Sequence, residues 1–388
     1  MSGTAYKRDQ VFWLAALQTG VFGIFMGGFG PALPLLQADQ GTSGAVAGLH
    51  GTALGLASII AGALNARVAH KFGRYQSIWL GLIVFNIGAL AFVALPEAWQ
   101  TIPSILFAGI GLSMTINNSV MFLSTHYKDD SPRAVSQANG VNSAFVLLGN
   151  FIIGTIAATQ FSWRLGLLLC LPFTIILYLL LGRQQKPEHI QEEGGHQRGS
   201  LPLKYWLSWI GMMFCIASEF AVAFWAAALF RERTELSAAL STTLVLAFPC
   251  GMMIGRWFGT YLFPDLDIDD RLKLIIGLQG VSFMAFWIST NPWISFLTLL
   301  VVGLGTSMQF ALSTLRLLRF GQAKPDLAIG RSSFSAGIAI GLSPLLLGYL
   351  ADIFGIVQGF LLVPVLVFCA FVIVTLVPSQ SDRTMEAK

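Results

Sequence analysis

The chain has 388 residues, of which 55% are hydrophobic and only 11% are charged. An ordinary soluble domain carries about 25% charged residues, so a chain this apolar cannot cover a water-facing surface and is expected to lie in lipid. The formal net charge of +4 is small and spread along the chain, which excludes a nucleic-acid-binding surface.

Twelve apolar runs follow one another, each near the ~20 residues that a helix needs to cross a bilayer. The first is longer than a secretory signal core and lacks its cleavage site, so it is read as a retained span. The sequence therefore predicts an all-α integral membrane protein with 12 transmembrane helices. They cover residues 11–36, 45–66, 75–95, 102–124, 134–158, 163–182, 206–230, 238–262, 272–290, 293–316, 329–351 and 355–377.

Basic residues set the expected orientation, because positively charged loops stay in the cytoplasm. With the N-terminus inside, only three of the 23 Lys and Arg residues fall outside, namely Arg164, Arg231 and Arg233. An even number of spans then places both termini in the cytoplasm. We expect a multi-pass protein of a bacterial-type inner (cytoplasmic) membrane.

A charged stretch without helical periodicity, residues 183–204, separates six spans from six and is predicted to be a flexible cytoplasmic linker. An offset of 193 to 194 residues relates the two halves, so that Gly109 and Gly111 correspond to Gly303 and Gly305. We predict two pseudo-symmetric six-helix bundles, residues 1–182 and 205–388. Such repeats place a substrate site at their interface, near the midplane.

The loop after the second span carries a family resemblance. Lys71, Gly73 and Arg74 match the major facilitator superfamily signature G-x-x-x-D-R/K-x-G-R/K-R/K, whereas His70 stands where the family has Asp. The chain resembles this superfamily over essentially its whole length. The resemblance implies a gating role for these four residues and a cavity lined by helices 1, 4, 7 and 10.

Two further segments refine the resemblance. Helices 7 and 8, from Ser218-Glu219-Phe220 to Gly255-Arg256, are similar to a bacterial branch near the sugar permeases. Helix 5 has Gly149-Asn150 where drug antiporters of this superfamily carry a Gly-Pro pair. The missing proline favours other members over drug exporters.

Glu219 is the sharpest single feature. It lies 14 residues beyond Tyr205, about 21 Å into its helix, and a carboxyl at that depth is expected to face a cavity or a partner rather than lipid. We predict that it binds and releases the coupling proton. The alternative is a neutral, hydrogen-bonded structural glutamate.

Uncharged polar and aromatic side chains inside the spans form the predicted substrate-binding set. Their amides offer donors and acceptors that suit hydroxyl-rich ligands, although such residues also hold membrane helices together. The set consists of Gln18, Asn117, Asn118, Asn139, Asn142, Trp225, Gln309 and Ser313. Phe22, Phe25 and Phe29 are open to two interpretations, stacking on a substrate ring or contact with lipid.

We expect no basic residue in the middle of the spans, since Arg256, Arg316 and Arg331 fall near inner ends. A cavity without a central cation favours neutral polar or cationic solutes over anions. His50 is a second proton-binding candidate, and a lone histidine is more often structural. The four cysteines lie in apolar runs without CxxC spacing, so no metal site, disulfide or cofactor is expected.

The sequence carries no HExxH, GxSxG or Walker motif, so we expect no enzyme. The leading hypothesis is a secondary transporter that moves a small neutral polar, possibly sugar-like, solute by alternating access with proton coupling, as a monomer in the bilayer. Two alternatives stay open. One is a proton-coupled exporter of amphipathic or cationic compounds, and the other is a non-transporting receptor on the same fold.

Overall fold

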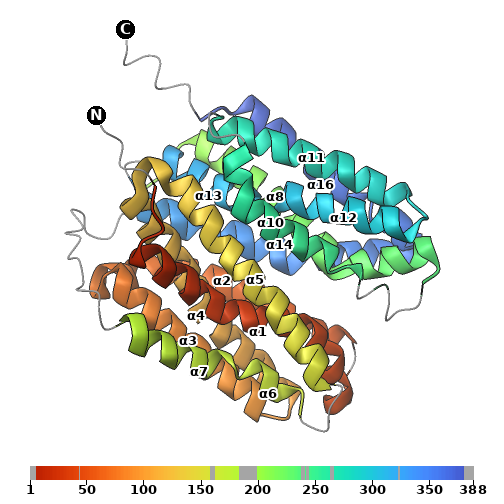
Figure 1. The fold of residues 1–388 in the computed structure, drawn as a ribbon, viewed down its shortest axis with the longest axis horizontal. Helices are drawn as coiled ribbons and strands as arrows, with labels where there is room; N and C mark the ends of the chain where they lie inside the picture. Colours follow the sequence, from red (N-terminus) through yellow and green to blue (C-terminus); the bar gives the residue numbers. More distant parts are fainter. Residues whose placement is uncertain are drawn as a thin grey trace. The chain divides into compact units, whose positions relative to one another are not determined.

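A computed structural model describes residues 6–42, 44–157, 162–182, 199–236, 241, 244–262, 266–321 and 324–379. The regular structure in these ranges is helical (Figure 1). The first half contains α1 (Gln10–Gln40), α2 (Gly44–Phe72), α3 (Arg74–Ala94), α4 (Ala98–Tyr127), η1 (Lys128–Asp130), α5 (Ser131–Ala157), α6 (Arg164–Leu167), α7 (Cys170–Leu177) and η2 (Tyr178–Gly182). The second contains α8 (Leu203–Thr234), α10 (Ala247–Leu262), α11 (Ile268–Ile288), α12 (Pro292–Thr306), α13 (Gln309–Phe320), α14 (Pro325–Phe354), α15 (Ile356–Gly359) and α16 (Leu362–Leu376).

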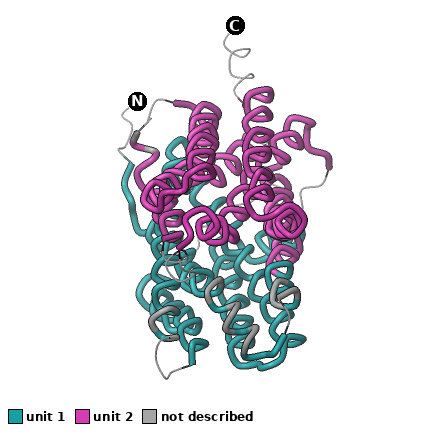
Figure 2. Tube along the Cα trace, turned by 90° about the vertical axis from the view of Figure 1, so that its right-hand side faces the viewer, with its two compact units in different colours: residues 1–53, 63–196 teal, residues 54–62, 197–388 magenta. Residues whose placement is uncertain are grey.

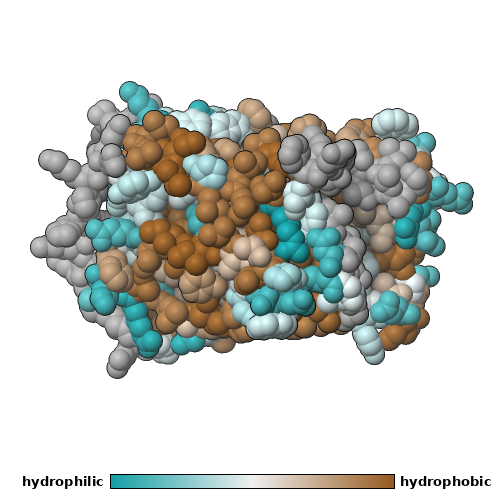
Figure 3. Space-filling view, turned by 90° about the horizontal axis from the view of Figure 1, so that it is seen from below, coloured by the Kyte–Doolittle hydropathy of each residue, from teal (hydrophilic) through white to brown (hydrophobic). Residues whose placement is uncertain are grey.

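Each of the twelve predicted spans is occupied by helix in its described residues. Ten helical segments of the described chain are long and apolar enough to cross a membrane. One of these, Ala98–Ile153, joins two predicted spans through the short η1, and α10 has only 16 described residues. Figure 3 shows hydrophobic side chains over much of one face, as a lipid-facing surface requires.

The chain groups into two compact units (Figure 2). Unit 1 comprises residues 1–53 and 63–196, and unit 2 comprises residues 54–62 and 197–388. Of the predicted linker, residues 183–198 lie outside the described ranges. Unit 2 includes a stretch of α2 because Ser58 donates a hydrogen bond to the backbone oxygen of Ser333 on α14, 3.0 Å away.

In unit 1, α1 and α5 pack closely through glycines. A Cβ atom added at Gly27 would clash with the backbone of Val146, and one added at Gly149 would clash with that of Ile24. Small residues let membrane helices approach to backbone contact.

The phenylalanines of α1 pack inside unit 1. Phe25 and Phe29 are buried and lie against Phe92 of α3.

In unit 2, the equivalent pair α8 and α14 is joined by side-chain hydrogen bonds instead. Tyr205, Trp209 and Trp225 of α8 donate to backbone oxygens of α14, at distances of 2.7, 2.7 and 2.9 Å. Ser335 and Ser343 of α14 donate in the opposite direction, to backbone oxygens of α8. The two helices are thus fixed in register along most of their length.

The internal repeat is visible in the packing. Gly111 of α4 lies against the backbone of Phe85 on α3, and Gly305 of α12 lies against the backbone of Gln279 on α11. Both members of the first contact are 194 residues from their counterparts in the second. The same helix crossing therefore occurs once in each unit.

Candidate functional site

The carboxyl of Glu219 is paired with a guanidinium. Glu219 lies on α8, 16 residues after its start, hence about 24 Å along the helix. Its Oε1 is 3.4 Å from Nη2 of Arg256 on α10, and the two side chains are only 17% and 13% exposed. The expectation that no basic residue reaches the middle of the spans is therefore wrong for Arg256, which lies inside α10 and whose side chain reaches Glu219 near the middle of α8.

A second contact of Arg256 is with the backbone of an interrupted helix. The tenth span is interrupted between Thr306, where α12 ends, and Gln309, where α13 begins. Nε of Arg256 donates to the backbone oxygen of Ser307 within this break, 2.8 Å away. Discontinuous helices provide backbone groups that bind ions and charged side chains inside a membrane.

A chain of amide hydrogen bonds runs beside the same break. Gln309 donates to Oε1 of Gln279 on α11 at 2.8 Å, and Gln279 donates to the hydroxyl of Ser218 on α8 at 3.1 Å. All three side chains are fully buried. Ser313 lies one turn beyond Gln309 on α13 and is also buried. Gln309 is thus linked through Gln279 to Ser218, the residue that precedes Glu219 on α8.

Polar side chains of unit 1 lie at a common depth. Counted along their own helices, Gln18, Asn117, Asn139 and Asn142 are about 12–17 Å from the start of α1, the end of α4 and the start of α5, and these helices contact one another. Asn142 donates to the backbone oxygen of Thr19 on α1 at 2.7 Å, and Asn139 donates within its own helix to Val135 at 3.1 Å. Asn142 therefore joins α1 to α5.

The most deeply placed members of this set differ in how their amides are used. Asn118 donates to Asn65 of α2 at 2.7 Å, and Asn117 is also buried. Gln18 is 1% exposed, and its Nε2 has no hydrogen-bond partner among the described residues. A buried amide group without a partner is costly, and Oδ1 of Asn118 also has no hydrogen-bond partner among the described residues; ligand binding by Gln18 stays a prediction.

Trp225 and the gating residues occupy other surroundings. The indole of Trp225 donates to the backbone oxygen of Pro344 on α14 and lies against Gly348.

His70 and Lys71 are exposed at the end of α2, whereas Arg74 is buried at the start of α3. Gly73 is the single residue between the two helices and has φ of +78°, a left-handed conformation that favours glycine. A glycine is therefore required at this joint.

His50 of α2 is fully buried, and its Nε2 lies 2.9 Å from the hydroxyl of Thr101 on α4.

The predicted absence of a metal site stays a prediction. Among the described residues, no group of three or more His, Cys, Asp or Glu side chains could hold a metal ion. The four cysteines are free thiols.

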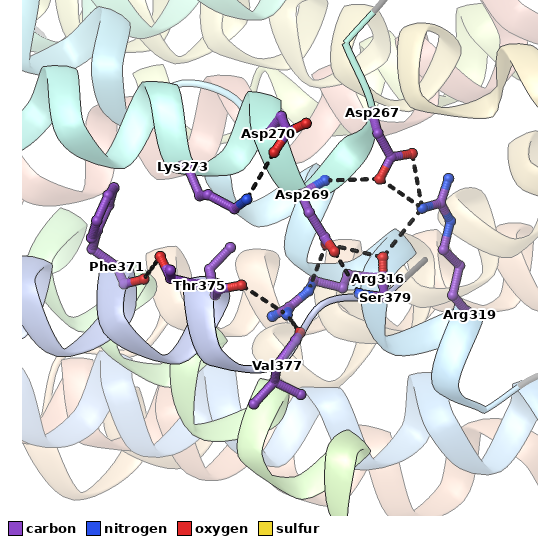
Figure 4. A network of polar contacts seen from close by, with 11 residues as sticks. Asp267, Asp269, Asp270, Lys273, Arg316, Arg319, Phe371, Thr375, Val377 and Ser379 are labelled. Atoms are coloured by element: carbon purple, nitrogen blue, oxygen red, sulfur yellow. Dashed lines mark hydrogen bonds and ion pairs between the residues drawn. The ribbon is translucent and has the colours of Figure 1, made fainter. Parts of the chain in front are cut away.

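A second ionic cluster, which sequence reasoning missed, lies at one end of unit 2 (Figure 4). Arg316 of α13 is 1% exposed, and its Nε is 2.8 Å from Oδ1 of Asp269 on α11. Arg316 also donates to the backbone oxygen of Val377, and the hydroxyl of Ser379 donates to Asp269 at 2.9 Å. The cluster thus fixes the end of α16 against α11 and α13.

Sequence comparison assigns the chain to a family. The sequence profile described as the Major Facilitator Superfamily matches residues 15–323. The chain belongs to this superfamily, and the predicted family is confirmed.

Curated relatives match only in part. The 2-nitroimidazole transporter of Escherichia coli (strain K12) is 28% identical over 170 residues, which are 42% of this chain and 41% of the relative. Inositol transporter 4 of Arabidopsis thaliana is 24% identical over 198 residues, 47% of this chain and 33% of the relative. The matched segments thus span well under half of these relatives. Both are named as transporters, in agreement with the expectation of a transporter rather than an enzyme.

Solved structures share the fold over nearly the whole chain. FucP, a Major Facilitator Superfamily transporter in the outward conformation, has a TM-score of 0.73 at 15% identity and covers 95% of this chain and 99% of its own. XylE, a proton:xylose symporter, has a TM-score of 0.70 at 15% identity and 94% coverage of both chains. The human organic anion transporter MFSD10 has a TM-score of 0.69 at 13% identity, with coverages of 94% and 98%. The predicted 12-helix, two-bundle fold is confirmed.

Proposed function

We propose that this protein is a proton-coupled secondary transporter of a small, hydroxyl-rich polar solute. The single observation that carries the proposal is the pair formed by Glu219 and Arg256 inside the membrane-spanning part of unit 2. An intramembrane ionisable group is expensive and marks an ion or substrate pathway by default. A carboxyl that can be neutralised by a proton, beside a guanidinium that stays charged, is suited to proton coupling.

The amide set supports the solute class. Asn139, Asn142 and Gln18 of unit 1 supply donors and acceptors at one depth, as hydroxyl-rich ligands require. FucP of E. coli is a fucose:proton symporter and XylE is a proton:xylose symporter, and the named relatives handle 2-nitroimidazole and inositol. All of these are small polar molecules. Because Arg256 places a cation beside Glu219 inside the span, a neutral solute is no longer favoured over an anionic one.

The proposed mechanism is alternating access without ATP. One proton moving through 100 mV supplies about 2.3 kcal/mol, which corresponds to nearly fifty-fold accumulation. Glu219 binds the proton on one side and releases it on the other. Lys71, Gly73 and Arg74, at the joint between α2 and α3, form the gate at the cytoplasmic face, with His70 beside them. The packing of Trp225 on α14 favours a structural role for that residue, and Gln309 and Asn118 have packing partners of their own.

The experiment uses the wild-type protein in liposomes with an imposed pH difference. Ligands are first identified by thermal shift among sugars, polyols, nucleosides and amphipathic cations, because a ligand that binds the folded state raises its apparent stability. The proposal predicts accumulation of a polyol or sugar-like ligand that follows the pH difference and stops when a protonophore removes it. Ligand binding without any counterflow would instead identify a receptor.

We also propose insertion in a bacterial-type inner membrane with both termini cytoplasmic, on the basis of the charge bias of the loops, and a monomeric state. Reporters fused after Lys388 should be cytoplasmic, whereas a reporter inserted near Arg233 should lie outside. An outside reporter at residues 185–200 would contradict this orientation.

A further inference from the structure

Unit 2 has an open groove on its surface, between α11 and α16. Its volume is about 640 Å³, which lies within the range of about 300–1,000 Å³ that is usual for ligand pockets. Leu274, Gly277, Leu278 and Val281 of α11 line the groove together with Phe371 of α16. The four residues of α11 recur every three or four positions, so they form one stripe along that helix. The groove is thus a continuous apolar surface along α11.

Gly277 gives the groove its depth. A Cβ atom added at Gly277 would have nothing within 4 Å, whereas one added at Gly280 of the same helix would lie 3.3 Å from Val367 of α16. Gly280 therefore faces the neighbouring helix, and Gly277 faces open space. The apolar side chains beside Gly277 are exposed, up to 75% for Val281. An acyl chain is the apolar material that a membrane supplies to cover such a surface.

A pair of opposite charges lines the same groove at the start of α11. Nζ of Lys273 lies 2.8 Å from Oδ1 of Asp270 (Figure 4). Both side chains are partly exposed, and among the described residues neither takes part in another hydrogen bond or ion pair. An exposed pair of this kind is weak. Both charges therefore remain available to a ligand.

The neighbouring acidic residues are engaged elsewhere. Asp269 binds Arg316, and Asp267 binds Arg319. In Figure 4 these two pairs lie on the side of α11 away from Phe371. The groove itself is thus lined by one negative and one positive charge.

The distance between the charged pair and the far end of the groove fits one leaflet of a bilayer. Val281 follows Asp270 by 11 residues, which is about 17 Å along a helix. Half of a hydrocarbon core is about 15 Å thick. A lipid whose acyl chain lies along the stripe therefore has its headgroup at the level of Asp270 and Lys273.

We propose that this groove is a binding site for one phospholipid with a primary ammonium headgroup, of the phosphatidylethanolamine class. The ammonium donates to the carboxylate of Asp270, the phosphate accepts from the ammonium of Lys273, and an acyl chain fills the space above Gly277. A choline headgroup has no N–H to donate, and a glycerol headgroup leaves Asp270 without a cation. On the orientation proposed above, the lipid belongs to the cytoplasmic leaflet.

The test is native mass spectrometry of the purified full chain in detergent, which reports both bound lipid and the number of protein copies. The protein is mixed with equal amounts of phosphatidylethanolamine, phosphatidylcholine and phosphatidylglycerol that carry identical acyl chains. We expect one retained phosphatidylethanolamine, favoured about fivefold over the other two. Equal retention of the three lipids, or a preference for phosphatidylglycerol, would overturn the proposal. The readout needs no transport, so it is independent of the proposed function.

Gly277→Phe tests the apolar part of the site, because its ring fills the groove without meeting a neighbour. It should lose the retained lipid. Gly341→Phe is the matched control, since Gly341 is also a half-buried glycine of unit 2 whose added Cβ would have nothing within 4 Å. Equal retention in wild type and Gly277→Phe would overturn the proposal. So would a wild-type dimer that Gly277→Phe abolishes, because a second copy of the chain would then cover the groove.

The double variant Asp270→Asn/Lys273→Gln tests the headgroup contacts without changing the net charge. It alters only partly exposed side chains, so it keeps the proposal testable if Gly277→Phe does not fold. We expect it to lose the fivefold preference for phosphatidylethanolamine over phosphatidylcholine. Arg231→Gln/Glu232→Gln, which removes two exposed opposite charges near the end of α8, should keep that preference. A preference that survives in the Asp270 and Lys273 variant would overturn the headgroup assignment.

Discussion

Two equivalent helix pairs, α1 with α5 in unit 1 and α8 with α14 in unit 2, are joined by different means. The first pair packs through Gly27 and Gly149 at backbone contact. The second is held by side-chain hydrogen bonds from Tyr205, Trp209 and Trp225. The difference extends to charge, since the Glu219 and Arg256 pair lies in unit 2. Unit 1 thus joins this helix pair through glycines at backbone contact, whereas unit 2 joins it through side-chain hydrogen bonds and also contains the Glu219 and Arg256 pair.

The largest effect is expected from filling the glycine contact of unit 1. Gly27→Leu forces a side chain into the backbone of Val146, and overpacking of this kind costs about 3 kcal/mol or more. We expect a large loss of folded protein, measured by thermal unfolding in detergent. Gly51→Ala is the matched control, because nothing lies within 4 Å of its added Cβ. A tolerated Gly27→Leu would break the comparison.

The next test compares the polar contacts of Asp269 in unit 2 and Tyr75 in unit 1. Asp269 binds Arg316 in unit 2, whereas Tyr75, at the corresponding position 194 residues earlier, donates to the backbone oxygen of Gly182 at 2.6 Å in unit 1. Asp269→Asn leaves a buried guanidinium without its carboxylate, which costs about 3–5 kcal/mol. Tyr75→Phe removes one neutral hydrogen bond, worth about 1 kcal/mol. Denaturation of both variants should give this order, and equal losses would contradict it.

A smaller effect is expected at Trp225. Trp225→Phe keeps an aromatic ring but removes the hydrogen bond to Pro344, so we expect a loss of about 1 kcal/mol in stability with transport retained. Trp206→Phe, at an exposed tryptophan of the same helix, serves as the control. If transport fails while stability is unchanged, Trp225 contacts the solute, as the sequence predicted.

The smallest effect concerns the start of α1. Partial burial of Asp9 acts against ionisation, but hydrogen bonds with Tyr127 and His126 outweigh it and hold the pKa of Asp9 below its usual value. The folded state therefore binds this proton less readily than the unfolded state, so the contribution is present above the unfolded pKa and is lost as pH falls through the folded pKa. It is worth a few tenths of a kcal/mol. Asp9→Asn should flatten the acidic limb of the stability profile, and an unchanged limb would exclude this contact as its cause.

The helices were predictable because a span is a local property of about 20 apolar residues. The pairing of Glu219 with Arg256 could not be predicted. The position of Arg256 along its own helix does not show how far its side chain reaches toward another helix. The partners of Asn118 and Gln309 lie 53 and 30 residues away on other helices, which no local pattern reveals. The helix break beside Ser307 contains no proline. Gly303 and Gly305 precede this break, but in the sequence they indicate only the internal repeat.

The central claim is that the carboxyl of Glu219 carries the coupling proton, and Glu219→Gln tests it most directly in liposomes. The glutamine keeps shape and hydrogen bonding but cannot titrate. The account predicts that accumulation driven by a pH difference vanishes, while exchange of labelled for unlabelled solute continues because it needs no net proton movement. A Glu219→Gln protein that still concentrates solute in response to the pH difference would contradict the account and leave His50 as the next candidate.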